Sequence, residues 1–304
     1  MARPAQSPPT LLMADPTDGH PPMTRKALIL LFGATLAWST SGLFARAIPL
    51  DTPTVILWRG LFGAAGLIAT LIWMKGRAGL GDFARLGRAG WLYALCSGLG
   101  MLLFVGSLKA TTIAHVAIIY ATVPFAAAAL GWLVLRENPG RVALLASGLA
   151  LAGSAVMVGV GGDGQPLGDL MALGMVAAMA AIIVIARARP EMPALAAGIV
   201  SAIWAPLACL PFASLAGITP GTIGLMAGFG LVNSTLGFAL FIAGSRRAAP
   251  VVTGLMGALE TPLTPLWVWL VFAETPSTAT LAGGGLVMLA VGWFILIEGR
   301  ATKS

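Results

Sequence analysis

The chain has 304 residues, of which 58% are hydrophobic and only 10% are charged, and its mean hydropathy is +0.92. Soluble domains carry about 25% charged residues because their surface faces water, so this composition excludes an ordinary soluble domain. The net charge of +7 does not indicate nucleic-acid binding, because the basic residues form no stripe with interleaved aromatic residues. We therefore expect a protein whose surface mostly faces membrane lipid, with no nucleic-acid partner.

The first 22 residues differ from the rest of the chain. They contain six prolines and no apolar run long enough for the hydrophobic region of a secretory signal. This composition predicts a disordered cytoplasmic tail over residues 1–22.

Ten apolar stretches of roughly 20 residues follow, the length that an α-helix needs to cross a hydrocarbon core about 30 Å thick. We expect an all-α integral membrane protein with ten transmembrane helices. The predicted spans are 27–48, 53–74, 90–109, 112–135, 141–160, 168–187, 194–213, 222–243, 250–273 and 279–297.

The Lys and Arg residues test this assignment. With the N-terminus in the cytoplasm, all of them fall in cytoplasmic segments except Arg46 and Lys109 outside and Arg59 within a span. Basic residues near span ends are strongly biased to the cytoplasmic side. The pattern favours a multi-pass protein of the cytoplasmic membrane with both termini in the cytoplasm.

An internal repeat divides the chain. The segment from Trp132 to Pro139 recurs from Trp269 to Pro276, an offset of 137 residues, and each copy follows a helix with a central proline. We predict two five-helix units over residues 23–160 and 161–299, and a cytoplasmic C-terminus over 300–304. Because each unit has an odd number of spans, the second is inverted. Inverted repeats are typical of secondary transporters.

Several motifs resemble the drug/metabolite transporter superfamily, in the type found in bacterial amino-acid and metabolite exporters. They are Trp38–Gly42, Trp58–Gly60, the Pro124 helix leading to Arg136–Glu137, and Glu260–Pro262 leading to Glu274. The resemblance covers roughly residues 27–297 and implies ten helices, a central substrate cavity between the halves, and outward transport. It does not fix the substrate.

Two charged residues lie well inside predicted spans, where charge normally faces the protein interior or water. Glu260 is either a partner for a substrate amine, a proton-carrying group, or a buried carboxylate bonded at the helix break near Pro262. Arg59 either binds a substrate carboxylate or anchors helix packing. An ion pair between Arg59 and Glu260 is a further possibility.

Polar and aromatic residues near the middle of spans complete the candidate set for the cavity. Trp38, Tyr120 and Trp204 lie deeper than the aromatic belts at the membrane interfaces. For Asn233 we favour an interhelical hydrogen bond over substrate contact. The full set of substrate-binding candidates is Trp38, Ser39, Ser41, Arg59, Tyr120, Trp204, Asn233 and Glu260.

These features predict a secondary or facilitated carrier that moves a small polar metabolite, preferably an amino acid or related compound, outward by alternating access. A nucleobase, a drug-like cation or a vitamin, and import instead of export, stay open as alternatives. An integral-membrane enzyme is a remote alternative, because the sequence has no cluster of acids or histidines within its spans. We expect no cofactor and no metal, a small-molecule substrate and surrounding lipid as partners, and leave the oligomeric state open.

Overall fold

The computed structural model describes residues 24–111, 113–158, 165–273 and 275–301, and all regular structure in these residues is helical. The predicted tail at 1–22, the predicted boundary between halves at 160–161, and residues 302–304 lie outside the described residues. The elements in chain order are α1 (Arg25–Ser39), α2 (Ser41–Ala47), α3 (Thr52–Lys75), the 3-10 helix η1 (Gly76–Arg85), α4 (Gly87–Ala110), α5 (Ile113–Tyr120), α6 (Val123–Leu135), α7 (Arg141–Val158), α8 (Pro166–Ala188), α9 (Ala194–Ala208), the 3-10 turn η2 (Leu210–Phe212), α10 (Pro220–Phe229), the π-helix η3 (Gly230–Gly237), α11 (Phe238–Ser245), α12 (Pro250–Ala258), α13 (Glu260–Phe272) and α14 (Thr278–Ala301).

The predicted all-α membrane fold is confirmed. Within the described residues, nine helical segments are long and apolar enough to cross a membrane, and α7 adds a shorter apolar helix over Arg141–Met157. Together they match the ten predicted spans. Local chemistry explains where two of these helices begin. At the start of α3, the Asp51 side chain accepts a hydrogen bond from the Thr54 N–H at 3.0 Å. A capping box of Thr219 and Thr222 begins α10.

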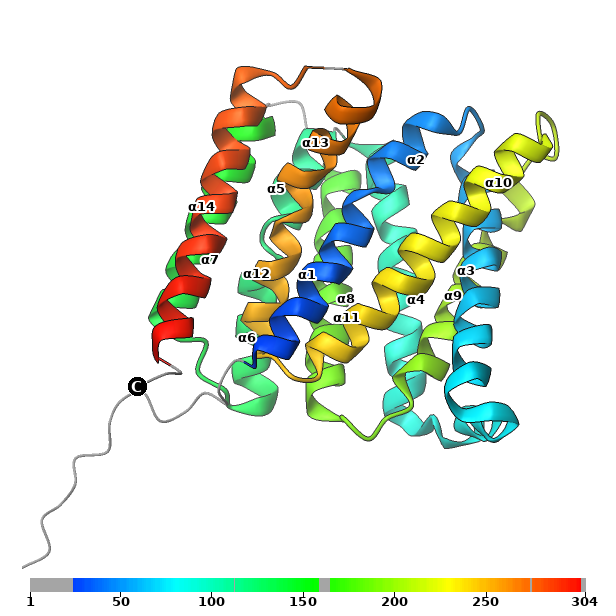
Figure 1. Cartoon of the computed structure of the whole chain (residues 1–304), viewed down its shortest axis with the longest axis horizontal. Coiled ribbons are helices and arrows are strands. Elements are labelled where there is room, and N and C mark those ends of the chain that lie inside the picture. Colours follow the sequence, from blue (N-terminus) through cyan, green and yellow to red (C-terminus); the bar gives the residue numbers. More distant parts are fainter. Residues whose placement is uncertain (1–23, 112, 159–164, 274, 302–304) are drawn as a thin grey trace, which may run out of the picture.

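The start of α1 and the end of α14 lie at the same end of the bundle, as an even number of crossings requires (Figure 1). The turns at this end carry most of the described basic residues, at 75–88, 136–141, 187–189 and 246–247. We call it the basic end, and the opposite end the far end. Most of the basic residues that the sequence analysis assigns to one side of the membrane therefore lie at one end of the bundle in the structure.

The backbone repeats where the sequence repeats. Of the non-glycine residues that the structure describes, only Arg136 and Ala273 have a positive φ, at 59° and 57°, and they are separated by the same 137-residue offset. Each ends its helix in the left-handed conformation. The Arg136 N–H donates to the Trp132 carbonyl at 3.0 Å, and the Ala273 N–H donates to the Trp269 carbonyl at 2.9 Å. The two turns are structural copies at opposite ends of the bundle.

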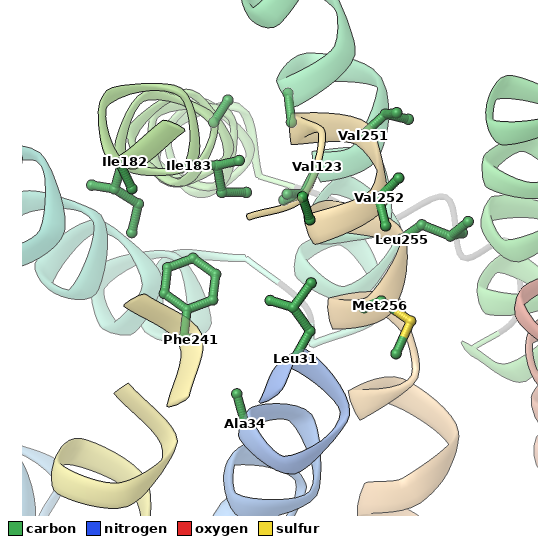
Figure 2. Close-up of a cluster of buried hydrophobic side chains, with 14 of the residues drawn as sticks. Leu31, Ala34, Val123, Ile182, Ile183, Phe241, Val251, Val252, Leu255 and Met256 are labelled. Carbon is green, nitrogen blue, oxygen red and sulfur yellow. The ribbon is translucent and has the colours of Figure 1, made fainter. Parts of the chain in front are cut away.

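The largest buried apolar cluster of the described residues lies between helices of both predicted halves. Figure 2 shows Leu31 and Ala34 from α1, Val123 from α6, Ile182 and Ile183 from α8, Phe241 from α11, and four residues of α12 between Val251 and Met256.

Small residues allow α7 and α14 to approach each other closely. Such contacts are common in membrane proteins, because the hydrophobic effect does not drive helices together within lipid. A Cβ added at Gly153 of α7 would lie 2.7 Å from the Gly283 carbonyl of α14.

Candidate functional site at the interrupted helices

Three spans are interrupted near their middle: the first at Thr40, the fourth at residues 121–122, and the ninth at Leu259. In the fourth and ninth spans a proline follows the interruption, Pro124 in α6 and Pro262 in α13. Proline is tolerated in the first turn of a helix, where its missing N–H would have no intrahelical partner. The eighth span contains the π-helix η3, a form that occurs frequently at functional sites. Interrupted spans from both predicted halves therefore bring backbone and side-chain polar groups close to the centre of the bundle.

Asn233 of η3 joins the eighth span to the interruption in the first. Its side-chain amide donates to the Ala37 carbonyl at 3.0 Å and to the Thr40 hydroxyl at 3.1 Å. In return, the Trp38 indole N–H donates to the Asn233 backbone carbonyl at 3.0 Å. These bonds agree with the interhelical role favoured for Asn233, and they fix the orientation of the Trp38 ring.

Trp38 and Tyr120 line a cavity on the basic-end side of the interruptions. The cavity is small: the centre of a water-sized sphere can reach about 20 Å³ of it, which is room for about one water molecule. The Trp38 ring lies 5.0 Å from the Phe241 ring, centroid to centroid. The complete lining is Trp38, Tyr120, Val123, Pro124, Met179, Ile183, Phe241, Thr253, Gly254, Gly257 and Ala258. It is therefore mostly apolar and aromatic, and it is formed by α1, α5, α6, α8, α11 and α12.

Glu260 lies beside this cavity as the first residue of α13, two positions after the lining residue Ala258. A helix N-terminus favours a negative charge, because its free N–H groups and dipole point toward it. The Tyr120 hydroxyl donates a long hydrogen bond of 3.5 Å to Glu260 Oε2. The two half-buried residues come from corresponding spans of the two predicted halves, and they link a carboxylate to the cavity wall.

Ser39 and Ser41 flank the interruption of the first span at Thr40. Ser39 is completely buried, and its hydroxyl accepts a 2.8 Å hydrogen bond from the Trp267 indole N–H. Trp267 belongs to α13, so this bond attaches the first span to the ninth. Ser41 begins α2 and is half-buried. The exposed Trp269 is on a different face of α13, as expected for two residues separated by two positions.

The Arg59 side chain contacts side chains of α4 and α10. Its Nη2 donates to the Met101 sulfur at 3.4 Å, and its Cζ lies 4.7 Å from the centroid of the Phe229 ring. Its Nε is buried and has no hydrogen-bond partner. Among the ion pairs of the described residues, none joins Arg59 to Glu260. The structure therefore holds Arg59 against α4 and α10, and the ion pair considered from the sequence is not formed.

Trp204 lies away from the cavity lining. Its indole N–H donates to the Ala94 carbonyl at 3.1 Å, and its ring packs against Gly98 of α4. These contacts join α9 to α4. They are the contacts of a residue that packs between helices, and Trp204 does not line the cavity.

Of the eight candidates, Trp38 and Tyr120 line the cavity, and Asn233 accepts a hydrogen bond from the Trp38 indole. Ser39, Ser41 and Glu260 lie at the adjoining interruptions, whereas Arg59 and Trp204 do not line the cavity. Sequence reasoning missed the remaining cavity residues. Phe241 is an aromatic residue deep in a span, and that same signal could have identified it. Met179, Ile183 and Thr253 resemble ordinary helix-packing residues, and the sequence contains no signal that distinguishes them.

In the described residues, interrupted membrane spans meet beside a central cavity, an arrangement that is typical of membrane transporters. Residues 25–159 match the profile of the EamA-like transporter family. This match covers most of the first predicted half of the chain, and because the EamA-like family is part of the drug/metabolite transporter superfamily, it confirms the resemblance seen in the sequence and indicates a membrane transporter of small molecules. No curated protein matches the chain. A solved structure described only as "Crystal structure of protein" has a TM-score of 0.77 and 18% sequence identity over 90% of this chain and 98% of that chain, which supports the fold.

Proposed function

We propose that the chain is a secondary or facilitated carrier that exports a small polar metabolite, an amino acid or related compound, across the cytoplasmic membrane by alternating access. The observation that carries the proposal is the position of Glu260. It is the acidic residue of the interrupted spans, it begins a helix half beside the cavity, and Tyr120 connects it to the cavity wall. A carboxylate at this depth can pair with a substrate amine or carry a proton.

The proposed mechanism and membrane orientation rest on the arrangement of the two predicted halves and their charges. The duplicated turns at Arg136 and Ala273 support two inverted units, and two such units can exchange conformations around a shared central site. The concentration of Lys and Arg at one end of the bundle supports placing that end in the cytoplasm. The outward direction rests on the family resemblance.

A drug-like organic cation is the second candidate substrate, and the composition of the cavity wall favours it. Trp38, Tyr120 and Phe241 present aromatic surface close to the Glu260 carboxylate. Aromatic faces attract cations, and the attraction is strongest where water is excluded. Arg59, the expected partner for an amino-acid carboxylate, is held by Met101 and Phe229 instead.

Transport in proteoliposomes tests the proposal and separates the two substrates. Labelled amino acids, nucleobases and organic cations are supplied with and without a pH gradient to the native protein and to the Glu260→Gln and Glu191→Gln variants. Glu191 is an exposed acid in the α8–α9 turn and serves as the control. We expect saturable flux that Glu260→Gln abolishes or makes independent of pH, while Glu191→Gln behaves as native. Unchanged flux and pH profile in Glu260→Gln would remove this carboxylate from the mechanism.

A further inference from the structure

An ion pair at the basic end joins the two predicted halves. Arg187 Nε lies 3.0 Å from Glu137 Oε1, and the two side chains are only 18% and 20% exposed. Glu137 belongs to the turn between α6 and α7, and Arg187 to the last turn of α8. The other described ion pairs at this end are local, since Lys75–Asp82 lies within the α3–η1 segment and Arg189–Glu191 within one turn. Of these three ion pairs, only Glu137–Arg187 joins the two predicted halves.

Arg187 extends the connection to two further segments. Its Nη1 donates to the Arg246 carbonyl at 3.4 Å, and the Arg246 guanidinium in turn donates to the Met192 carbonyl. Burial lowers the pKa of the Arg246 guanidinium from its ordinary value. Glu137 Oε2 and Arg246 Nε are buried without hydrogen-bond partners. The network therefore connects four chain segments, but some of its polar groups lack hydrogen-bond partners. Because these groups are not fully bonded, separating the segments breaks fewer hydrogen bonds.

Beside this network, α6 and α12 pack closely. A Cβ added at Gly131 would lie 2.9 Å from Pro250, and one added at Gly254 would lie 2.9 Å from the Pro124 backbone. Pro124 and Gly254 line the central cavity, whereas Gly131 and Pro250 line a smaller hollow that also includes Glu137. The contact between α6 and α12 thus extends from the cavity to the ion pair.

We propose that the Glu137–Arg187 ion pair is a lock that holds the α6–α12 contact closed at the basic end, and that it breaks when the cavity opens toward that side. This inference rests on the proposed alternating access. The spans that contain α6 and α12 are the fourth of each half, so their separation at one end is a relative movement of the two halves. The ion pair adds a cost to that separation, and its removal shifts the population toward the form open at the basic end.

Alkylation of a buried reporter cysteine tests the lock without any substrate. The chain has only two cysteines, so Cys96→Ala and Cys209→Ala provide a background without thiols. Val251→Cys places the reporter on α12 beside the hollow, at a position that is 2% exposed. The alkylation rate by a maleimide is measured on purified protein that melts cooperatively, with Glu137→Gln, Arg187→Gln, the charge reversal Glu137→Arg with Arg187→Glu, and Asp82→Asn added in turn.

Each single lock variant should raise the rate about tenfold, which corresponds to about 1.4 kcal/mol in the closed-to-open equilibrium. The charge reversal should restore the slow rate. Asp82→Asn removes the local Lys75 pair at the same end and should leave the rate within about twofold of the background.

Native rates in folded Glu137→Gln and Arg187→Gln would overturn the proposal. An equal rise in Asp82→Asn, or a rise that the charge reversal does not reverse, would overturn it as well. If one single variant does not fold, the other still tests the lock. Because no substrate is present, absence of transport would refute the proposed function without affecting this result.

Discussion

Replacing Asn233 with leucine should weaken the attachment between the first and eighth spans. The leucine side chain is similar in size but cannot donate, so the bonds to the Ala37 carbonyl and the Thr40 hydroxyl are lost. The Trp38 bond to the residue 233 backbone carbonyl can remain. Interhelical hydrogen bonds in membrane proteins average about 0.6 kcal/mol and reach about 1.7 kcal/mol. Two such bonds at a helix interruption give an expected loss of about 1–3 kcal/mol in the free energy of unfolding.

Unfolding in mixed micelles, followed by circular dichroism, measures this loss. Ser147→Ala is the matched control, because Ser147 is also fully buried but its hydroxyl bonds only to the Ala143 carbonyl in its own helix. We expect the control to change the free energy of unfolding by less than about 0.5 kcal/mol. Equal effects of Asn233→Leu and Ser147→Ala would refute the reasoning that Asn233 stabilises the interruption through contacts between helices.

Three further outcomes follow from the site and its surroundings. Trp38→Ala should raise the apparent KM for transport about tenfold, whereas Trp204→Ala should leave KM unchanged and lower the melting temperature, because only Trp38 lines the cavity; equal KM changes would contradict this distinction. Gly153→Val should destabilise the protein by about 1–3 kcal/mol in the same unfolding assay, since the added side chain meets the α14 backbone at Gly283; a native value would show that α7 and α14 can move apart freely. Arg59→Met should cost less than about 1 kcal/mol, because a desolvated guanidinium with an unpartnered Nε is replaced by a flexible apolar side chain, and a larger loss would reveal a stronger role for the Arg59 charge.

The number of helices follows from the sequence because apolar length and basic turns are properties of local segments. The interruptions are harder to predict. Pro124 and Pro262 indicate where the fourth and ninth spans are uneven, and both interruptions occur next to them. The interruption at Thr40 has no proline, and the Thr40 hydroxyl accepts a hydrogen bond from Asn233, which is 193 residues away in the chain. A single sequence contains no local sign of such a distant partner.

The site candidates illustrate the same limit. Depth in a span identified Trp38 and Tyr120, but it also selected Trp204, whose ring packs on Gly98. Depth is set by position along a helix, whereas access to the cavity is set by the direction that the side chain faces. That direction depends on how helices rotate against one another. Small residues such as Gly254 and Gly257 contribute to the cavity by leaving space, a property that composition does not reveal.

Counterflow in proteoliposomes tests the central claim, a single cavity that opens alternately to the two sides, most directly. Vesicles are loaded with an unlabelled compound that the transport panel has identified, and a trace of the labelled compound is added outside. Alternating access predicts that the label accumulates transiently above its equilibrium level, because the loaded carrier returns faster than the empty one. Equilibration at a rate independent of the compound inside would contradict the account and indicate a passive pore.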